Sequence, residues 1–226
     1  MSVLRRALLR GSETIESVRA AEPGFDALYA RVCAAGTDSK WWFGSQYEHE
    51  GGLALLQHPD EFTALCLLLR RHEPRATYLE IGSAGGGTCR FLHEEVGLGR
   101  VLAIDDGGHP RAAEQEENFA AIGGVVRHLG DSHAPAAAAF LAEHAPDRSI
   151  DIAFVDGDHS FRGVRQDVRM VLPHVRPGGL LILHDTRRCR GVEATWLALA
   201  ARRGVRPLAE LCGSEHPLGI GVARLG

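Results

Sequence analysis

Residues 76–88 read ATYLEIGSAGGGT. The first residues favour a β-strand, which ends on the carboxylate of Glu80 and is followed by four glycines within six residues. The next segment, Cys89–Val96, is compatible with a helix. A strand, a glycine turn and a helix in this order place backbone N–H groups at a helix N-terminus, where a ligand can bind. The stretch therefore predicts a nucleotide-binding turn.

Short apolar runs alternate with helix-length segments after this turn. The runs predicted to be strands are residues 78–81, 101–104, 125–129, 150–155 and 180–183. Parallel strands need long crossovers, so the pattern predicts an α/β domain with a mostly parallel, doubly wound sheet and helices on both faces. Residues 205–211 and 219–225 are joined by a short connection, which favours an antiparallel pair at the edge of the sheet.

The N-terminal region precedes this pattern. Residues 13–35 predict two short helices, interrupted at Pro23 and Gly24. Residues 40–44 hold the densest aromatic cluster of the chain, which either anchors this region by packing, forms a lid or wall of a substrate pocket, or makes a dimer contact. We therefore divide the chain into a helical and aromatic appendage, residues 1–56, and a ligand-binding domain, residues 57–226.

Composition narrows the choice of partner and compartment. The formal net charge is −4 and no stretch concentrates Lys and Arg, which argues against a nucleic acid or an acidic membrane surface as partner. No segment reaches the roughly 20 apolar residues that span a bilayer, and the N-terminus lacks a secretory signal. Five scattered cysteines without a C-x-x-C pair indicate neither a disulfide framework nor a zinc–thiolate site, so we expect a reducing cytoplasm.

Acidic residues recur where the predicted parallel strands end. In open α/β sheets ligands bind beyond the carboxyl ends of the strands, so these residues form a candidate site as a set. Any one of them alone also fits a helix cap or a turn. Recurrence at five strand ends favours a binding site, formed by Glu80, Asp105–Asp106, Asp131–Ser132, Asp156–His159 and His184–Thr186.

The glycine turn departs from the dinucleotide-binding pattern. Read from Gly82 it is G-x-A-x-x-G, with Ala84 where a second glycine lets the backbone approach a pyrophosphate. Glu80 would also be a poor neighbour for a pyrophosphate, whereas it suits an aminoacyl group. Asp105 can accept both ribose hydroxyls in either type of cofactor, so it does not distinguish them.

Taken in order, the glycine turn, Asp105, the Gly130–Ser132 turn, the run FVDGDHS at 154–160 and the run RPGG at 176–179 resemble class I S-adenosylmethionine-dependent methyltransferases. Within that class the chain is most similar to small bacterial O-methyltransferases of the catechol-type, macrolide-sugar and cephalosporin-hydroxylase-like group. The resemblance covers roughly residues 57–225. It implies a Rossmann-like, seven-stranded sheet whose last strand is antiparallel.

The resemblance also implies roles for single residues. Glu80, Gly82, Ser83 and Ala84 would bracket the methionine part of S-adenosylmethionine. Asp105 would bind the ribose, Asp131 and Ser132 the adenine edge, and Asp156 would lie near the transferred methyl group.

Three roles for the histidines stay open. Metal-dependent relatives bind magnesium through an acid after the fourth strand, matched by Asp156, and a pair after the fifth strand, matched by Asp185 with either His184 or Thr186. The first role is a divalent-metal site, for Mg or Mn, on Asp156, His184 and Asp185. Because an imidazole also suits other metals or none, the second is a metal-free base, His184 or His159. The third is a purely structural role for His184. For His159, a separate structural reading is that it caps the helix expected at 161–171.

The function expected from these residues is methyl transfer from S-adenosylmethionine to a hydroxyl of a small molecule, a sugar or phenol of natural-product biosynthesis. One alternative is an NAD(P)-dependent oxidoreductase, although Ala84 breaks its fingerprint and the sole lysine, Lys40, forms no Tyr-x-x-x-Lys pair. Another is a protein that binds S-adenosylmethionine without catalysis. The segments expected to select the acceptor, residues 41–47, the loop after Asp185 and residues 210–217, carry no readable signature.

Overall fold

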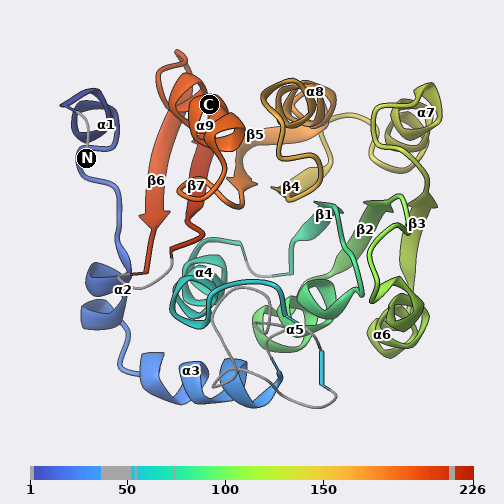
Figure 1. Ribbon diagram of the computed structural model, residues 1–226, viewed down its shortest axis with the longest axis horizontal. Helices are drawn as coiled ribbons and strands as arrows, with labels where there is room; N and C mark the ends of the chain where they lie inside the picture. Colours follow the sequence, from blue (N-terminus) through green and yellow to red (C-terminus); the bar gives the residue numbers. More distant parts are fainter. Residues whose placement is uncertain (1–2, 37–51, 54, 74, 214–216) are drawn as a thin grey trace.

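The computed structural model describes residues 3–36, 52–53, 55–73, 75–213 and 217–226, and one seven-stranded sheet lies at its centre (Figure 1). The strands are β1 (Thr77–Ile81), β2 (Arg100–Asp105), β3 (Val125–Leu129), β4 (Ile150–Val155), β5 (Val175–Leu183), β6 (Val205–Leu211) and β7 (Ile220–Leu225). Their order is β3-β2-β1-β4-β5-β7-β6. The first five strands are parallel, and β7 is antiparallel to both β5 and β6. The predicted Rossmann-like fold with an antiparallel last strand is confirmed.

Helices cover both faces of this sheet (Figure 1). One face carries α4 (Pro59–His72), α5 (Gly87–Val96) and α6 (Gln115–Ile122), preceded by the 3-10 turn η2 (Ala112–Glu114). The other carries α7 (Pro135–His144), α8 (Phe161–Val171) and α9 (Arg190–Ala200). Successive strand residues point to opposite faces, so Tyr78 joins the core under α4 and α5 while Leu79 joins the core on the other face, which includes Trp196 of α9.

Three short helices precede α4: α1 (Val3–Leu8), α2 (Ile15–Ala21) and α3 (Phe25–Ala34). The two expected helices are α2 and α3, whereas α1 was not expected. Phe25 and Leu28 are buried in the same core as α4. The aromatic cluster at 40–44 lies outside the described residues, so the lid, the dimer contact and the division at residue 56 stay predictions. Among the helices of the described residues, none has the length and apolar character that crossing a membrane requires.

Strand β5 begins at Val175, five residues before the predicted start at residue 180. The run Pro177-Gly178-Gly179 reads as a turn, because proline and glycine usually interrupt strands. Pairing with β4 overrides that signal, since Val175 lies opposite Ile150 and a register shift absorbs the irregular residues. The other strand limits agree with the sequence to within one residue.

Candidate active site

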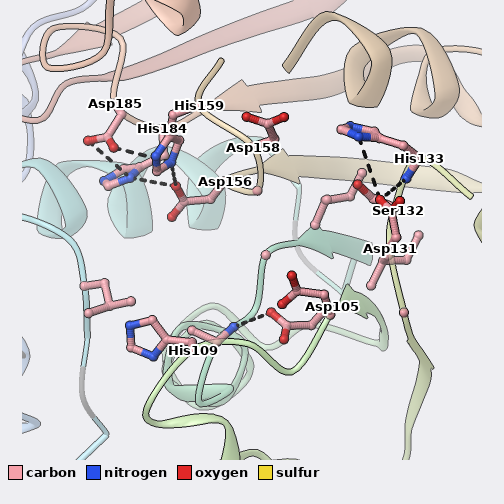
Figure 2. A pocket seen from close by; sticks show the side chains of 18 of the residues that line it. Asp105, His109, Asp131, Ser132, His133, Asp156, Asp158, His159, His184 and Asp185 are labelled. Atoms are coloured by element: carbon pink, nitrogen blue, oxygen red, sulfur yellow. Dashed lines mark hydrogen bonds and ion pairs between the residues drawn. The ribbon is translucent and has the colours of Figure 1, made fainter. Parts of the chain in front are cut away.

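A cavity of about 780 Å³ opens where the parallel strands end. This volume suits a small-molecule or cofactor site. Nine of the eleven predicted site residues line it: Gly82, Ala84, Asp105, Asp131, Ser132, Asp156, His159, His184 and Asp185. Figure 2 shows Asp156, His159, His184 and Asp185 gathered in one part of the cavity, while Asp105 and Asp131 lie in another. The carboxyl ends of five strands thus form one site, as the sequence predicts.

The glycine turn joins β1 to the wall of this cavity. Gly82 has φ +84°, and a Cβ atom there would lie 2.2 Å from the backbone oxygen of Asp156. Ala84 also has a positive φ, 46°, and its backbone N–H donates to Oδ2 of Asp105 at 2.7 Å. The N–H of Gly107 donates to Oδ1 of the same carboxylate at 2.7 Å. Asp105 is therefore fixed in place at the cavity, with lone pairs remaining to accept the hydroxyls of a ribose.

Two of the predicted cofactor residues do not reach the cavity wall. Glu80 is 1% exposed, and its Oε2 accepts hydrogen bonds from the Tyr78 hydroxyl at 2.8 Å and the Cys89 thiol at 2.9 Å. Burial raises the pKa of Glu80 to about 8. Ser83 is also buried, and its Oγ accepts from the Gln115 amide at 3.1 Å. Because both side chains turn into the protein, the expected contacts with the methionine part are not supported by this placement.

The strand end after β3 contains a partner that the sequence did not reveal. Ser132 Oγ donates to Oδ1 of Asp167 at 2.8 Å, and Nε2 of His133 lies 3.2 Å from the same oxygen. Asp167 comes from α8, is fully buried, and has its pKa raised by that burial. His133 and His109 line the cavity as well. These contacts depend on helix packing, and no spacing rule connects Ser132 with Asp167.

The strands β4 and β5 end in a compact group of charged side chains. Nδ1 of His184 lies 3.0 Å from Oδ1 of Asp156 and 3.7 Å from Oδ1 of Asp185. Burial alone would lower the pKa of His184. The negative charges of Asp156, Asp185 and the more distant Glu61 outweigh burial and raise this pKa to about 9. Burial likewise opposes ionisation of Asp156, and the two imidazoles nearby lower its pKa to about 2.

His159 faces the cavity rather than the helix behind it. Its Nε2 lies 3.2 Å from Oδ1 of Asp156 and 3.4 Å from Oδ2 of Asp185, and its side chain is 43% exposed. The hydrogen bond with Asp156 raises the pKa of His159. The hydroxyl of Ser160 caps α8 by accepting from the N–H of Gly163. The capping role considered for His159 is therefore wrong.

Asp156, His184 and Asp185 fit a divalent cation. One donor atom from each lies within 4.8 Å of the others. Oδ1 of Asp185 is buried without a hydrogen-bond partner among the described residues, which leaves it available as a ligand. Thr186 is fully buried and does not line the cavity, so His184 is the neighbour of Asp185 that faces the site.

Glu61 of α4 lies behind this group and was not among the expected site residues. Its two carboxylate oxygens accept the N–H groups of Gly213 and Gly219, each at 2.8 Å. Burial raises its pKa to about 7. Glu61 thereby holds the two ends of the segment between β6 and β7, which contributes Leu218 to the cavity wall.

Residues 79–186 match the family model described as a methyltransferase domain. Residues 79–186 therefore carry a methyltransferase domain. It is 27% identical over 171 residues to demethylmacrocin O-methyltransferase of Streptomyces fradiae, covering 73% of this chain and 37% of that protein. It is 30% identical over 117 residues to an uncharacterized protein of Acanthamoeba polyphaga mimivirus, covering 48% of this chain and 51% of that protein. The chain therefore spans about half the length, or less, of these curated relatives.

Solved structures share the fold of this methyltransferase domain. An O-methyltransferase of Bacillus cereus, in complex with S-adenosylhomocysteine, has a TM-score of 0.59 at 18% identity and covers 93% of this chain and 96% of its own. The O-methyltransferase TomG of Streptomyces achromogenes, in complex with S-adenosylmethionine, has a TM-score of 0.57 at 21% identity. The match covers 86% of this chain and 88% of the TomG chain. The resemblance seen in the sequence is confirmed, and these structures establish the fold.

Proposed function

We propose that this protein transfers a methyl group from S-adenosylmethionine to a hydroxyl of a small acceptor, a sugar or a phenol of natural-product metabolism. The observation that carries the proposal is the contact between the glycine turn and the acid after β4. The backbone of Gly82 packs directly on that of Asp156, and Asp156 contacts both His159 and His184. The region suited to a cofactor and the region suited to activating a hydroxyl therefore share one cavity.

The donor set of the cavity suits a cofactor with an adenosine and a cationic sulfur. Asp105 and Asp131 offer carboxylate oxygens at neighbouring strand ends, where hydroxyl and amino groups can donate to them. Asp156 presents a carboxylate whose pKa is lowered to about 2, so it is ionised near neutral pH. When bound, S-adenosylmethionine supplies a methyl group on a positively charged sulfur. Carboxylates attract this positive charge, whereas they would repel the negative charge of a pyrophosphate. The acids in the cavity therefore support this cofactor over NAD(P).

Transfer also requires that the acceptor hydroxyl lose its proton. A divalent cation supplies this chemistry by lowering the pKa of a hydroxyl that it contacts. Asp156, His184 and Asp185 would hold such a cation. His159, the imidazole most exposed to the cavity, would either take the proton itself or help to hold the cation. Transfer would form a bond from the methyl carbon to the acceptor oxygen and break its bond to sulfur, which would leave a methyl ether and S-adenosylhomocysteine.

The sugar or phenol acceptor is supported by two kinds of observation. The relative from Streptomyces fradiae is named as an O-methyltransferase of demethylmacrocin. The net charge of −4 favours a small acceptor over a nucleic acid. A cytoplasmic location is a further part of the proposal, and the scattered cysteines are its only support. A homo-oligomer was considered only as a use for the aromatic cluster at 40–44, and the oligomeric state stays an open question for measurement.

Calorimetric titration of the full chain with S-adenosylhomocysteine tests the cofactor. We expect binding in the presence of EDTA and a loss of at least about tenfold in affinity for Asp105→Asn. Asp147→Asn, in an exposed turn before β4, should bind as the wild type does. Binding of NADH instead of S-adenosylhomocysteine would reverse the assignment in favour of an oxidoreductase.

Product formation tests the reaction. The purified protein, S-adenosylmethionine and a panel of sugars and phenols are incubated with EDTA, Mg²⁺ or Mn²⁺, and the methylated product is measured by mass spectrometry. Asp156→Ala should abolish product formation while S-adenosylhomocysteine still binds. If no acceptor is methylated although the nucleoside binds, a non-catalytic protein that binds S-adenosylmethionine becomes the better description.

A further inference from the structure

A second group of donor atoms adjoins the first and includes a thiol. His159, Asp185 and Cys189 each offer one donor atom within 4.8 Å of the others. Oδ2 of Asp185 lies 3.4 Å from Nε2 of His159 and 3.6 Å from Sγ of Cys189. Oδ1 of the same carboxylate faces His184. Asp185 therefore belongs to two groups of three donor residues, and only the second group contains a sulfur donor.

The spacing within this second group is that of ligands around one small cation. Bonds of about 2.0 Å to nitrogen or oxygen and about 2.3 Å to sulfur, at tetrahedral angles, separate neighbouring ligand atoms by about 3.3–3.7 Å. A charge-assisted N–H···O hydrogen bond would instead bring its atoms to about 2.7–2.9 Å. The 3.4 Å contact between Oδ2 of Asp185 and Nε2 of His159 falls in the first range. The Cys189 thiol donates a hydrogen bond to the same oxygen at 3.6 Å, a distance that two ligands of one cation can also keep.

The local backbone brings Asp185 and Cys189 to the same side of the chain. The N–H of Cys189 donates to the backbone oxygen of Asp185 at 3.0 Å, so the two residues are one turn apart. Asp185 itself is 6% exposed, and its Oδ2 is the oxygen that faces His159 and Cys189. Burying a carboxylate is costly, and a cation bound to it would offset that cost.

We propose that His159, Asp185 and Cys189 form a metal site that binds a borderline cation of the Zn²⁺ or Co²⁺ type in preference to Mg²⁺. Imidazole and thiolate ligands favour such cations, whereas Mg²⁺ prefers oxygen ligands. Three protein ligands leave a fourth position open, the arrangement of catalytic rather than structural zinc sites. His159 and Asp185 line the cavity, so a position left open on the cation would be reached from the cavity.

This assignment gives His159 the role of a ligand instead of a base. It rests on the proposed function for the use of the cation, while cation binding itself is independent of methyl transfer. Without a cation, burial and the Asp185 carboxylate raise the pKa of Cys189 to about 11. A coordinating thiol is deprotonated, so a bound cation would reverse that effect.

Absorption spectroscopy with Co²⁺ tests the site. The full chain is stripped of metal, kept reduced, and titrated with Co²⁺. We expect a thiolate-to-Co²⁺ charge-transfer band that Zn²⁺ removes by displacement and that an excess of Mg²⁺ leaves unchanged. Zn²⁺ should bind at least about 100-fold more tightly than Mg²⁺.

Variants of the cysteines identify the ligand. Cys189→Ser should lose the charge-transfer band and bind Co²⁺ about tenfold more weakly or worse, yet keep the affinity for S-adenosylhomocysteine. Cys33→Ser, on α3 and half-buried, is the matched control and should keep the band. Cys189→Asp should bind a cation again, with the preference shifted towards Mg²⁺ and Mn²⁺ because all-oxygen sites suit these ions.

Two results would overturn the inference: a Co²⁺ complex of the wild type without a thiolate band, or equal affinity for Mg²⁺ and Zn²⁺. Titration with S-adenosylhomocysteine in EDTA separates these failures from failure of the proposed function. Protein that binds the nucleoside but gives no thiolate band refutes the metal site alone. Protein that gives the band but does not bind the nucleoside refutes the cofactor alone.

Discussion

The backbone of Gly82 lies so close to that of Asp156 that a Cβ atom would come within 2.2 Å of the Asp156 carbonyl oxygen. Gly82 also has φ +84°, which L-residues with a side chain rarely adopt. The turn after β1 and the acid after β4 are thus in direct backbone contact. A change in one must displace the other.

Gly82→Ala should therefore disturb both the cofactor region and Asp156. We expect the free energy of unfolding to fall by about 2–4 kcal/mol, from the left-handed backbone and the overlap together. Binding of S-adenosylhomocysteine should be lost in calorimetry on protein that remains folded. Ala84→Gly is the matched control in the same turn. Ala84 already has φ 46°, so glycine there should leave stability and binding nearly unchanged.

Glu61→Gln should loosen the segment between β6 and β7. An amide has one acceptor oxygen, so it cannot receive both the Gly213 and the Gly219 N–H groups. We expect the free energy of unfolding, measured by chemical denaturation, to fall by about 1–3 kcal/mol. Hydrogen exchange of those two amides should become faster. Thr63→Val on the same helix is the control: the hydroxyl of Thr63 is buried and has no hydrogen-bond partner in the part of the chain that the structure describes, so its removal should cost nothing. Equal losses in both variants would contradict the role of Glu61.

Glu80 should make the protein less stable as the pH rises. The pKa of Glu80 is about 8 in the folded protein, against 4.5 for an ordinary glutamate side chain, so the unfolded chain releases this proton first. The contribution of Glu80 is fully present below about pH 4.5 and is lost as the pH rises through about 8. Urea denaturation at pH 5 and at pH 8 measures this effect. The free energy of unfolding should fall less between the two pH values for Glu80→Gln than for the wild type. Glu94→Gln, half-exposed on α5, should behave as the wild type does.

His159→Gln should separate chemistry from cofactor binding. The side chain is either a ligand of the cation or the base, and turnover should fall about 100-fold or more in both cases. The affinity for S-adenosylhomocysteine should change little, because His159 is in the part of the cavity away from Asp105 (Figure 2). His72→Gln, at the end of α4, is the control and should retain turnover. Full activity of His159→Gln would remove this residue from the mechanism.

The sheet was predictable from the sequence because its strands are buried and apolar along most of their length. Strand β4 is nearly all buried, and such runs stand out between helix-length segments. The start of β5 was not predictable, because pairing with β4 outweighs the local effect of proline and glycine. Helix α1 was missed for a similar reason. Its Arg5 is 1% exposed and forms ion pairs with Glu193 and Glu210, contacts that only the folded chain creates.

The positions of the strand ends likewise allowed most cavity residues to be predicted, whereas side-chain direction did not follow from them. Glu80 was expected at the cavity because of its place in the chain, yet it points into the core. Glu61 was missed because its partners lie 152 and 158 residues away in the sequence. Cys189 was not singled out because the sequence has no C-x-x-C pair, and His159, which lies near it and Asp185 in the structure, is on a different loop.

The place of β7 between β5 and β6 bears on how the protein is made. Until residues 220–225 have left the ribosome, β5 is paired with β4 on one side and has an open edge on the other. Strand β6 then has no neighbouring strand in the sheet. An open strand edge can pair with another chain, so a chain from which β6 has emerged and β7 has not is prone to aggregate. Strand β7 completes this part of the sheet, and the yield of folded protein should depend on how quickly it pairs with β5 and β6.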